Sequence, residues 1–427
     1  MMLRRNVTVW ACLAAAGLAN AQDPAWVGTG WQDHATKPDA FAVLDGSLVA
    51  AGLSATGWSS VMRWVGDGWE PLGTPLQGTA RTAITADLGA GEALYVGGSL
   101  RLGDQAHAGV WVFDGAGWST VGGAFDGSVR ALAVFDDGSG PALYAAGSFV
   151  SVGGQPAANI ARWDGSAWTP LGAGVTGAVE ALAVFEDGSG PALYAAGGFT
   201  EAGGLPAGRV ASWDGAAWSP AGAGVDATVQ ALAVYDDGAG PALYAGGRFQ
   251  TAEGAPATAL ARWDGASWEG VIDPALQPTN DVSALLVTDE ASPSLVVGIG
   301  RIGTAHAVAR FDGVRFTGVP APVTNGVPYP VTAMAWWDGD LYAADHKVWL
   351  PDCGTETEAF TGVARLTTGG RCAGDFNCDG TLDAADLVAM LDFGPGDWTD
   401  LNRDLRFDFF DVAELVRRLG EGCAVVH

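Results

Sequence analysis

The chain has 427 residues, of which 48% are hydrophobic, so it is long enough to bury a large core. Its 48 Asp and Glu residues outnumber its 21 Lys and Arg residues, which gives a formal net charge of −27 at pH 7. This charge argues against nucleic acid and anionic membrane surfaces as partners, because both require clustered positive charge on the protein.

The first 21 residues have the three parts of a secretory signal peptide. Arg4 and Arg5 supply a basic start, an apolar run extends over residues 7–18, and Ala19-Asn20-Ala21 forms a cleavage motif. We expect cleavage before Gln22 and therefore a secreted, extracellular or cell-surface protein. No other segment is long and apolar enough to predict a membrane span.

A stretch that begins "VRALAVF" at residue 129 returns at residues 179 and 229, an offset of 50 residues each time. Each copy contains four short apolar runs separated by Gly, Pro and Asp, which is the pattern of β-strands joined by turns. An Asp-Gly pair between the third and fourth runs favours a tight hairpin. Each copy therefore predicts a four-stranded antiparallel meander, and a repeat of this length indicates an array or a propeller.

Weaker copies extend the array to seven units over residues 22–370. The third predicted strand of each unit ends in an apolar residue, and six units carry an aromatic residue five positions later. The first set is Trp64, Phe113, Trp163, Trp213, Trp263, Phe311 and Leu366, and the second is Trp69, Trp118, Trp168, Trp218, Trp268 and Phe316. The last unit lacks a fourth strand, and Trp26 lies in a matching segment at the N-terminus. The sequence predicts an all-β, seven-bladed β-propeller of four-stranded antiparallel blades, closed by this N-terminal strand.

The repeats resemble kelch-like repeats, in which two glycines end the second strand and aromatic residues frame the third and fourth. The glycine pairs are Gly97-Gly98, Gly197-Gly198 and Gly246-Gly247, and the first, sixth and seventh units lack them. The resemblance covers about residues 24–370 and implies the fold. It implies little about function, because propellers support unrelated activities.

Some features of the repeats allow both structural and functional interpretations. The turns between the first and second strands carry acidic pairs, which either attract a cation or simply form solvated turns, and turn chemistry favours the second interpretation. These pairs are Asp136-Asp137, Glu186-Asp187, Asp236-Asp237 and Asp289-Glu290. The loops between the second and third strands, on the opposite face, are longer and more varied, so we expect a ligand there.

The aromatic and basic residues of the repeats are expected to have structural roles. The aromatic pairs recur in six of the seven units, which predicts packing between blades rather than sugar stacking. A recurrent arginine alternates with these aromatics and is expected to pair with carboxylates on neighbouring strands. The arginines are Arg63, Arg162, Arg262, Arg310 and Arg365.

Four cysteines remain once the signal peptide is removed, all within the last 75 residues. An even number in an exported chain suggests two disulfides with three alternative pairings. We favour Cys378 with Cys423, and Cys353 with Cys372, without excluding the others.

Residues 371–427 contain two copies of a calcium-loop pattern. Oxygen-bearing side chains at alternating positions of a 12-residue loop converge on one ion together with the backbone carbonyl of position 7, which is Thr381 or Arg406 here. The first copy also has Gly380 at the turn position. The candidate ligands are Asp375, Asn377, Asp379, Thr381, Asp383 and Asp386 in the first copy, and Asp400, Asn402, Asp404, Arg406, Asp408 and Asp411 in the second. Leu405 replaces the glycine in the second copy. A helical pattern follows each loop, so we expect a small α-helical C-terminal module with two EF-hand-like loops and one or two Ca²⁺ ions.

The two loop-helix halves, over about residues 372–423, resemble a type I dockerin. That resemblance implies calcium binding and docking onto a cohesin-like domain of another extracellular protein. The family's contact positions fall on Ala384-Ala385 in one half and on Phe409 and Phe410 in the other. Phe409 and Phe410 are therefore candidate partner-binding residues, although one of them could instead fill the small core.

Sequence motifs offer little support for catalysis. The five histidines are scattered without metal-ligand spacing, and neither Gly-x-Ser-x-Gly nor His-Glu-x-x-His occurs. The favoured hypothesis is a secreted, non-catalytic binding or scaffold protein whose propeller recognises a protein or a glycan. One alternative is an extracellular polysaccharide-degrading enzyme, either a lyase or a hydrolase acting on O-glycosyl bonds, since dockerin-like modules often accompany such enzymes. The other is a structural cell-surface protein.

Overall fold

The structure is a computed structural model that describes residues 25–28, 35–54, 59–65, 68–272, 281–289, 293–299, 308–313, 316–319, 331–338, 340–349 and 359–367. The larger of two compact units comprises Gly28–Leu350 and Glu358–Arg365. The secondary-structure elements within these ranges are all β-strands. The same ranges contain no helix with the length and apolar character needed to cross a bilayer.

The strands follow the repeats of the sequence. The N-terminal strand and those of the first two repeats are β1 (Ala25–Gly28), β2 (Ala35–Leu44), β3 (Ser47–Ser54), β4 (Val61–Trp64), β5 (Trp69–Pro71), β6 (Gln77–Asp87), β7 (Glu92–Leu102), β8 (Gln105–Phe113) and β9 (Trp118–Thr120). The third repeat contains β10 (Ser128–Asp136), β11 (Pro141–Ser148), β12 (Ser151–Val152), β13 (Gln155–Pro156), β14 (Ile160–Trp163) and β15 (Trp168–Pro170). The fourth contains β16 (Val179–Glu186), β17 (Pro191–Gly197), β18 (Glu201–Ala202), β19 (Leu205–Pro206), β20 (Val210–Trp213) and β21 (Trp218–Pro220).

The remaining strands belong to the last three repeats. The fifth contains β22 (Val229–Asp236), β23 (Pro241–Gly247), β24 (Thr251–Ala252), β25 (Ala255–Pro256), β26 (Leu260–Trp263) and β27 (Trp268–Gly270). The sixth contains β28 (Val282–Val287), β29 (Leu295–Ile299), β30 (Val308–Phe311) and β31 (Phe316–Val319), and the last contains β32 (Val331–Trp337), β33 (Asp340–Trp349) and β34 (Ala359–Thr367).

All of these strands belong to β-sheets, and the strands paired within each of the first six repeats run antiparallel. Five sheets are four-stranded, in the orders β10-β11-β14-β15, β16-β17-β20-β21, β22-β23-β26-β27, β28-β29-β30-β31 and β1-β34-β33-β32. The strands β2 to β9 form one eight-stranded sheet, because Leu53 of β3 pairs with Thr79 of β6. Three two-stranded ribbons, β12-β13, β18-β19 and β24-β25, fold the loops between the second and third strands of the third, fourth and fifth repeats.

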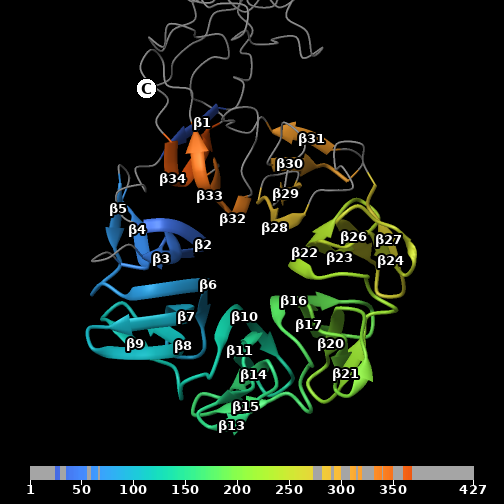
Figure 1. The fold of residues 1–427 in the computed structure, drawn as a ribbon, viewed down its shortest axis with the longest axis horizontal. Helices are drawn as coiled ribbons and strands as arrows, with labels where there is room; N and C mark the ends of the chain where they lie inside the picture. Colours follow the sequence, from blue (N-terminus) through green and yellow to red (C-terminus); the bar gives the residue numbers. More distant parts are fainter. Residues whose placement is uncertain are drawn as a thin grey trace, which may run out of the picture. The chain divides into compact units, whose positions relative to one another are not determined.

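The first strand of each repeat lies beside the first strand of the next, and these contacts close on themselves. Among the described residues the neighbours run β2, β6, β10, β16, β22, β28, β32 and back to β2. Figure 1 shows these strands innermost in the larger unit. The contact between the last and first repeats includes a hydrogen bond from Thr332 Oγ1 to the Pro38 carbonyl at 3.3 Å and one from Trp337 Nε1 to the Gly46 carbonyl at 3.0 Å. The larger unit is therefore an all-β, propeller-like fold.

The fold class predicted from the sequence needs correction. It combined seven separate four-stranded blades, closed by the N-terminal strand, with a small α-helical module carrying two EF-hand-like calcium loops. The first two repeats instead share an eight-stranded sheet, since β3 and β6 extend far enough to pair at Leu53 and Thr79. The described residues contain no helix, and residues 371–427 lie outside them, so the helical part of the prediction has no support.

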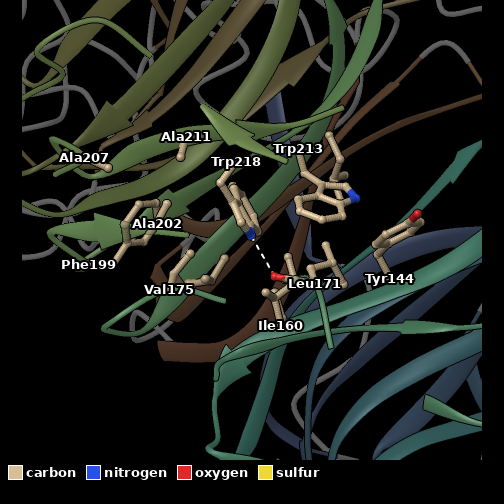
Figure 2. Close-up of a cluster of buried hydrophobic side chains, with 14 of the residues drawn as sticks. Tyr144, Ile160, Leu171, Val175, Phe199, Ala202, Ala207, Ala211, Trp213 and Trp218 are labelled. Atoms are coloured by element: carbon tan, nitrogen blue, oxygen red, sulfur yellow. Dashed lines mark hydrogen bonds between the residues drawn. The ribbon is translucent and has the colours of Figure 1, made fainter. Parts of the chain in front are cut away.

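The tryptophan that starts the fourth strand joins each of the second to fifth repeats to the preceding one. Trp218 lies in a core cluster with Tyr144, Ile160 and Leu171 of the third repeat, and its Nε1 donates to the Leu171 carbonyl at 2.9 Å (Figure 2). The same bond recurs for Trp118 to Leu72, Trp168 to Val121 and Trp268 to Ala221, each at 2.8 Å. These contacts confirm the predicted packing of aromatic residues between repeats, with the indole N–H satisfied by a backbone oxygen.

A β-bulge at a shared position interrupts the first strand of every repeat. At this position the register shift passes over one residue of each first strand, and β2 has a second shift between Ala35 and Lys37. The residues passed over at the shared position are Asp39, Arg81, Arg130, Glu180, Gln230, Ser283 and Thr332. A bulge re-aims the side chain that it carries. Neighbouring repeats are thereby linked by the ion pairs Arg81–Asp39, at 3.8 Å, and Arg130–Glu180.

Candidate functional site

The first aspartate of the turn between the first and second strands has a local structural role. Asp136 Oδ1 accepts the backbone N–H groups of Gly138 at 2.8 Å and Gly140 at 2.9 Å. Asp236 accepts the equivalent pair in the fifth repeat. Aspartate commonly stabilises tight turns in this way, so turn chemistry accounts for this residue, as the sequence predicted.

The second aspartate of the same turn accepts a tyrosine hydroxyl in three successive repeats. The pairs are Tyr144–Asp137 at 3.0 Å, Tyr194–Asp187 at 2.7 Å and Tyr244–Asp237 at 2.8 Å. Burial raises the pKa of each tyrosine, and the hydrogen bond to aspartate raises it further. The hydroxyl therefore stays protonated and donates to the carboxylate.

An arginine completes this arrangement in the third and fifth repeats. Arg162 Nε lies 2.9 Å from Asp137 Oδ2, and Arg262 Nε lies 3.0 Å from Asp237 Oδ2. All four side chains are between 12% and 19% exposed, so these ion pairs are largely removed from solvent. The predicted pairing of the recurrent arginines with carboxylates is confirmed for Arg162 and Arg262.

The fourth repeat has Ser212 where its neighbours have arginine. The strand pairings are equivalent in the three repeats: Tyr144 opposite Arg162, Tyr194 opposite Ser212, and Tyr244 opposite Arg262. The Ser212 hydroxyl donates to the Ser219 carbonyl at 3.4 Å. Within the part of the chain that the structure describes, no Lys, Arg or His forms a salt bridge with Asp187.

An open depression of about 820 Å³ lies at this position. Its lining includes Asp187, Tyr194 and Ser212 of the fourth repeat, Asp137 of the third and Trp263 of the fifth. The indole Nε1 of Trp263 donates to the Tyr194 hydroxyl at 3.4 Å. The depression therefore combines an aromatic wall with a chain of hydrogen bonds that ends on the Asp187 carboxylate.

Turns of adjacent repeats hold the floor of this depression in place. Gly265, in the Asp-Gly turn of the fifth repeat, has φ +98°, and a Cβ added there would lie 2.7 Å from the Asp187 carbonyl oxygen. Gly215 of the fourth repeat has φ +101°, and a Cβ added there would lie 2.9 Å from Asp137 Cβ. Only glycine combines this left-handed conformation with such a close approach, so the repeated Asp-Gly pair fixes the Asp187 turn against its neighbour.

The Asp187 carboxylate is half-buried and negatively charged at neutral pH. Burial raises its pKa, but hydrogen bonds from the Ser189 hydroxyl, at 2.5 Å, the Tyr194 hydroxyl and the Ser189 backbone outweigh burial and hold the pKa below its usual value. The site thus presents a stable anionic acceptor beside an aromatic wall.

Other residues singled out in the sequence lie outside the described residues. These are the calcium-ligand candidates Asp375, Asn377, Asp379, Thr381, Asp383, Asp386, Asp400, Asn402, Asp404, Arg406, Asp408 and Asp411, the contact candidates Phe409 and Phe410, and the cysteines Cys353, Cys372, Cys378 and Cys423. The calcium sites, the docking residues and the disulfides all remain predictions. Within the described ranges, no three His, Cys, Asp or Glu side chains are grouped so as to hold a metal ion.

The depression lies at the end of the repeats opposite the one where we expected a ligand. Its lining includes turns between the first and second strands and between the third and fourth strands, together with strand residues such as Tyr194, Ser212 and Trp263. The loops at the other end are closed by the two-stranded ribbons, and these bridge to the preceding segment at Phe125–Val152, Val175–Ala202 and Val225–Ala252. The recurrent arginines do not by themselves predict a role for Ser212; its signal in the sequence is a serine where the adjacent repeats have Arg162 and Arg262.

No protein-family model matches the chain, and no curated protein matches it. Among solved structures, the chain is similar to a crystal structure described as the extracellular domain of the one component system BT4673 from B. thetaiotaomicron, with a TM-score of 0.51 and 9% sequence identity. The match covers 81% of this chain and 40% of that chain, so this chain spans less than half the length of its structural neighbour. At this identity the likeness shows the fold alone. Neither the kelch-like nor the dockerin resemblance is established.

Proposed function

We propose that this chain is an extracellular binding protein and that the depression beside Asp187 is its recognition site. The observation that carries this proposal is the replacement of an arginine by Ser212, which leaves a half-buried carboxylate at the floor of an open, aromatic-lined hollow. Concave sites with aromatic walls and few polar groups are typical of ligand binding. The signal-peptide pattern of residues 1–21 and the extracellular origin of the structural neighbour support export of the chain.

Binding is favoured over glycoside hydrolysis at this depression. Hydrolysis of a glycosidic bond requires a general acid whose pKa is raised. The pKa values of Asp137 and Asp187 lie below the usual value, because hydrogen bonds outweigh burial. That of Asp214 is lowered mainly by the N–H groups of Ala217 and Ala216. Asp137, Asp187 and Asp214 are therefore better suited to accept hydrogen bonds as charged carboxylates than to donate a proton as a general acid.

The binding proposal is tested by comparing the wild-type chain with Ser212→Arg in capture experiments. Both proteins, immobilised at equal density, would be exposed to defined panels of extracellular peptides and glycans. We expect saturable capture by the wild type that Ser212→Arg reduces at least about tenfold, since a filled depression excludes the ligand. Equal capture by both proteins would contradict the assignment of the site.

The calcium ligands predicted between Asp375 and Asp411 form a separate part of the proposal. The alternation of oxygen-bearing residues supports Ca²⁺ binding by residues 371–427, and Phe409 and Phe410 are proposed to contact a cohesin-like extracellular partner. Calorimetric titration of chelator-treated full-length protein should show one or two saturable Ca²⁺ sites. Asp375→Ala combined with Asp386→Ala should remove one of them. A flat titration of the wild type would refute calcium binding.

A further inference from the structure

The third and fifth repeats show what occupies the space that is open in the fourth. Besides its ion pair with Asp137, Arg162 donates from Nη2 to the Ser139 hydroxyl, so the guanidinium fills the gap between the turn and the third strand. Arg262 makes the equivalent ion pair with Asp237 and donates to the Gly240 carbonyl at 3.5 Å. The same turn therefore accommodates a guanidinium twice, on either side of the depression.

The fourth repeat keeps the aspartate and serine acceptors that Arg162 uses in the third. Asp187 Oδ2 is held by the Tyr194 hydroxyl, and the Ser189 hydroxyl lies 2.5 Å from Asp187 Oδ1, as the Ser139 hydroxyl does from Asp137 Oδ1. Among the described residues, the ion pairs formed by the carboxylates at this turn position involve Asp137 and Asp237 but not Asp187. The fourth repeat therefore has the acceptor oxygens of Asp187 and Ser189 but has Ser212 in place of the arginine.

We propose that the depression binds a guanidinium group of a ligand, seated where the guanidinium of Arg162 or Arg262 lies in the adjacent repeats. A guanidinium forms stronger, charge-assisted hydrogen bonds with a carboxylate and can accept none, which matches a site rich in oxygen acceptors. Trp263 lines the same depression, and an indole is the best aromatic partner for a cation. This inference deepens the proposed binding function and rests on it.

Two kinds of ligand present a guanidinium group: a peptide that contains an arginine side chain, and a free guanidine compound. The depression has a volume of about 820 Å³, more than a lone guanidinium requires, and it is open, so a peptide that extends beyond its arginine can enter. The test therefore uses a blocked Gly-Arg-Gly peptide and agmatine as separate probes. The same peptide with citrulline, which keeps the shape and removes the charge, is the matched ligand control.

The experiment is a calorimetric titration of the full-length protein with each probe at pH 7. We expect saturable binding of one arginine peptide per chain, with the citrulline peptide at least about tenfold weaker because the charge-assisted bonds are lost. Tighter binding of the peptide than of agmatine would assign the site to a peptide arginine, and the reverse order to a free guanidine. No saturable binding of either probe, or equal affinity for arginine and citrulline, would overturn the inference.

Variants connect the binding to the replaced arginine. Ser212→Arg should abolish binding, because the new side chain occupies the site, while Ala255→Arg adds the same charge at an exposed position on the opposite loops and should bind normally. Arg262→Ser should raise the stoichiometry from one to two by opening an equivalent site at Asp237. Circular dichroism spectra would confirm that each variant is folded. Unchanged binding by Ser212→Arg would overturn the inference.

The outcomes also separate this inference from the proposed function. If Ser212→Arg abolishes capture of an extracellular ligand but neither guanidine probe binds the wild type, the recognition site stands and the guanidinium assignment is wrong. If the probes bind the wild type and Ser212→Arg still captures the extracellular ligand, the cation site is real and recognition lies elsewhere.

Discussion

A single aspartate position in the repeat serves two purposes. In the third and fifth repeats, Asp137 and Asp237 each hold a tyrosine and an arginine, and in the fourth repeat Asp187 holds the tyrosine alone. In the third and fifth repeats, the arginine pairs with the aspartate carboxylate and largely shields it from solvent. Its replacement at Ser212 leaves the acceptor available without altering the strand pairing around it.

Removal of this acceptor in the third repeat should destabilise the fold. Asp137→Asn removes the charge that faces Arg162, and we expect a loss of roughly 1–3 kcal/mol in the free energy of unfolding, because both partners are mostly buried. Asp136→Asn is the matched control, since an asparagine oxygen can still accept the turn N–H groups. Urea unfolding measures both variants, and equal stability of the two would contradict this account.

The same carboxylate should contribute to acid sensitivity. The pKa of Asp137 in the folded protein lies below its usual value, because hydrogen bonds and Arg162 outweigh burial. Its stabilising contribution is therefore present above the unfolded-state pKa of about 4 and is lost as the pH falls through the folded-state value. The stability of Asp137→Asn should decline less steeply than that of the wild type between about pH 5 and pH 2. Parallel declines would count against the predicted linkage.

At the scale of the strands, contacts between neighbouring repeats bury the apolar side chains that a single sheet would leave exposed to solvent. The fourth-strand tryptophan is the recurring example, since Trp218 is buried and bonds to the backbone of the preceding repeat. Trp218→Phe keeps an aromatic ring and removes the N–H donor, so we expect a loss of about 1 kcal/mol. Trp218→Ala should cost roughly 3–5 kcal/mol, because it also leaves a cavity. Thermal unfolding would measure both, and equal losses for the two would contradict this account, because they would assign the effect to the indole N–H bond and leave none to packing.

The bulge residues of the first strands provide a second contact between repeats. Arg130 and Glu180 form an ion pair and are 34% and 26% exposed, so solvent screening limits its contribution. A double-mutant cycle with Arg130→Gln and Glu180→Gln should give a coupling free energy of about 0.5–1 kcal/mol that decreases in high salt. A coupling of zero at low salt would mean that this pair does not join the repeats.

At the scale of the whole molecule, the sequence predicted the structural features that recur in the 50-residue repeats. The 50-residue offset, the paired aromatics and the Asp-Gly turns follow from local pattern, and the structure places them as expected. The shared sheet of the first two repeats could not be predicted, because it depends on strand extension and on one residue pair, Leu53 and Thr79. In the sequence, the candidate site is marked only by a difference between aligned repeats, where "IARW" of the third repeat contains Arg162 and "VASW" of the fourth contains Ser212. The depression itself could not be predicted, because its lining comes from three repeats that meet only in the folded chain.

The crystal structure of Ser212→Arg tests the central claim most directly, because that claim is that the depression is the space of a missing guanidinium. We predict that the new side chain will lie with its Nε within hydrogen-bond distance of Asp187 Oδ2, as Arg162 Nε lies 2.9 Å from Asp137 Oδ2, and that the depression will be closed. An arginine that turns out into solvent, with the depression still open beside Asp187, would contradict the account.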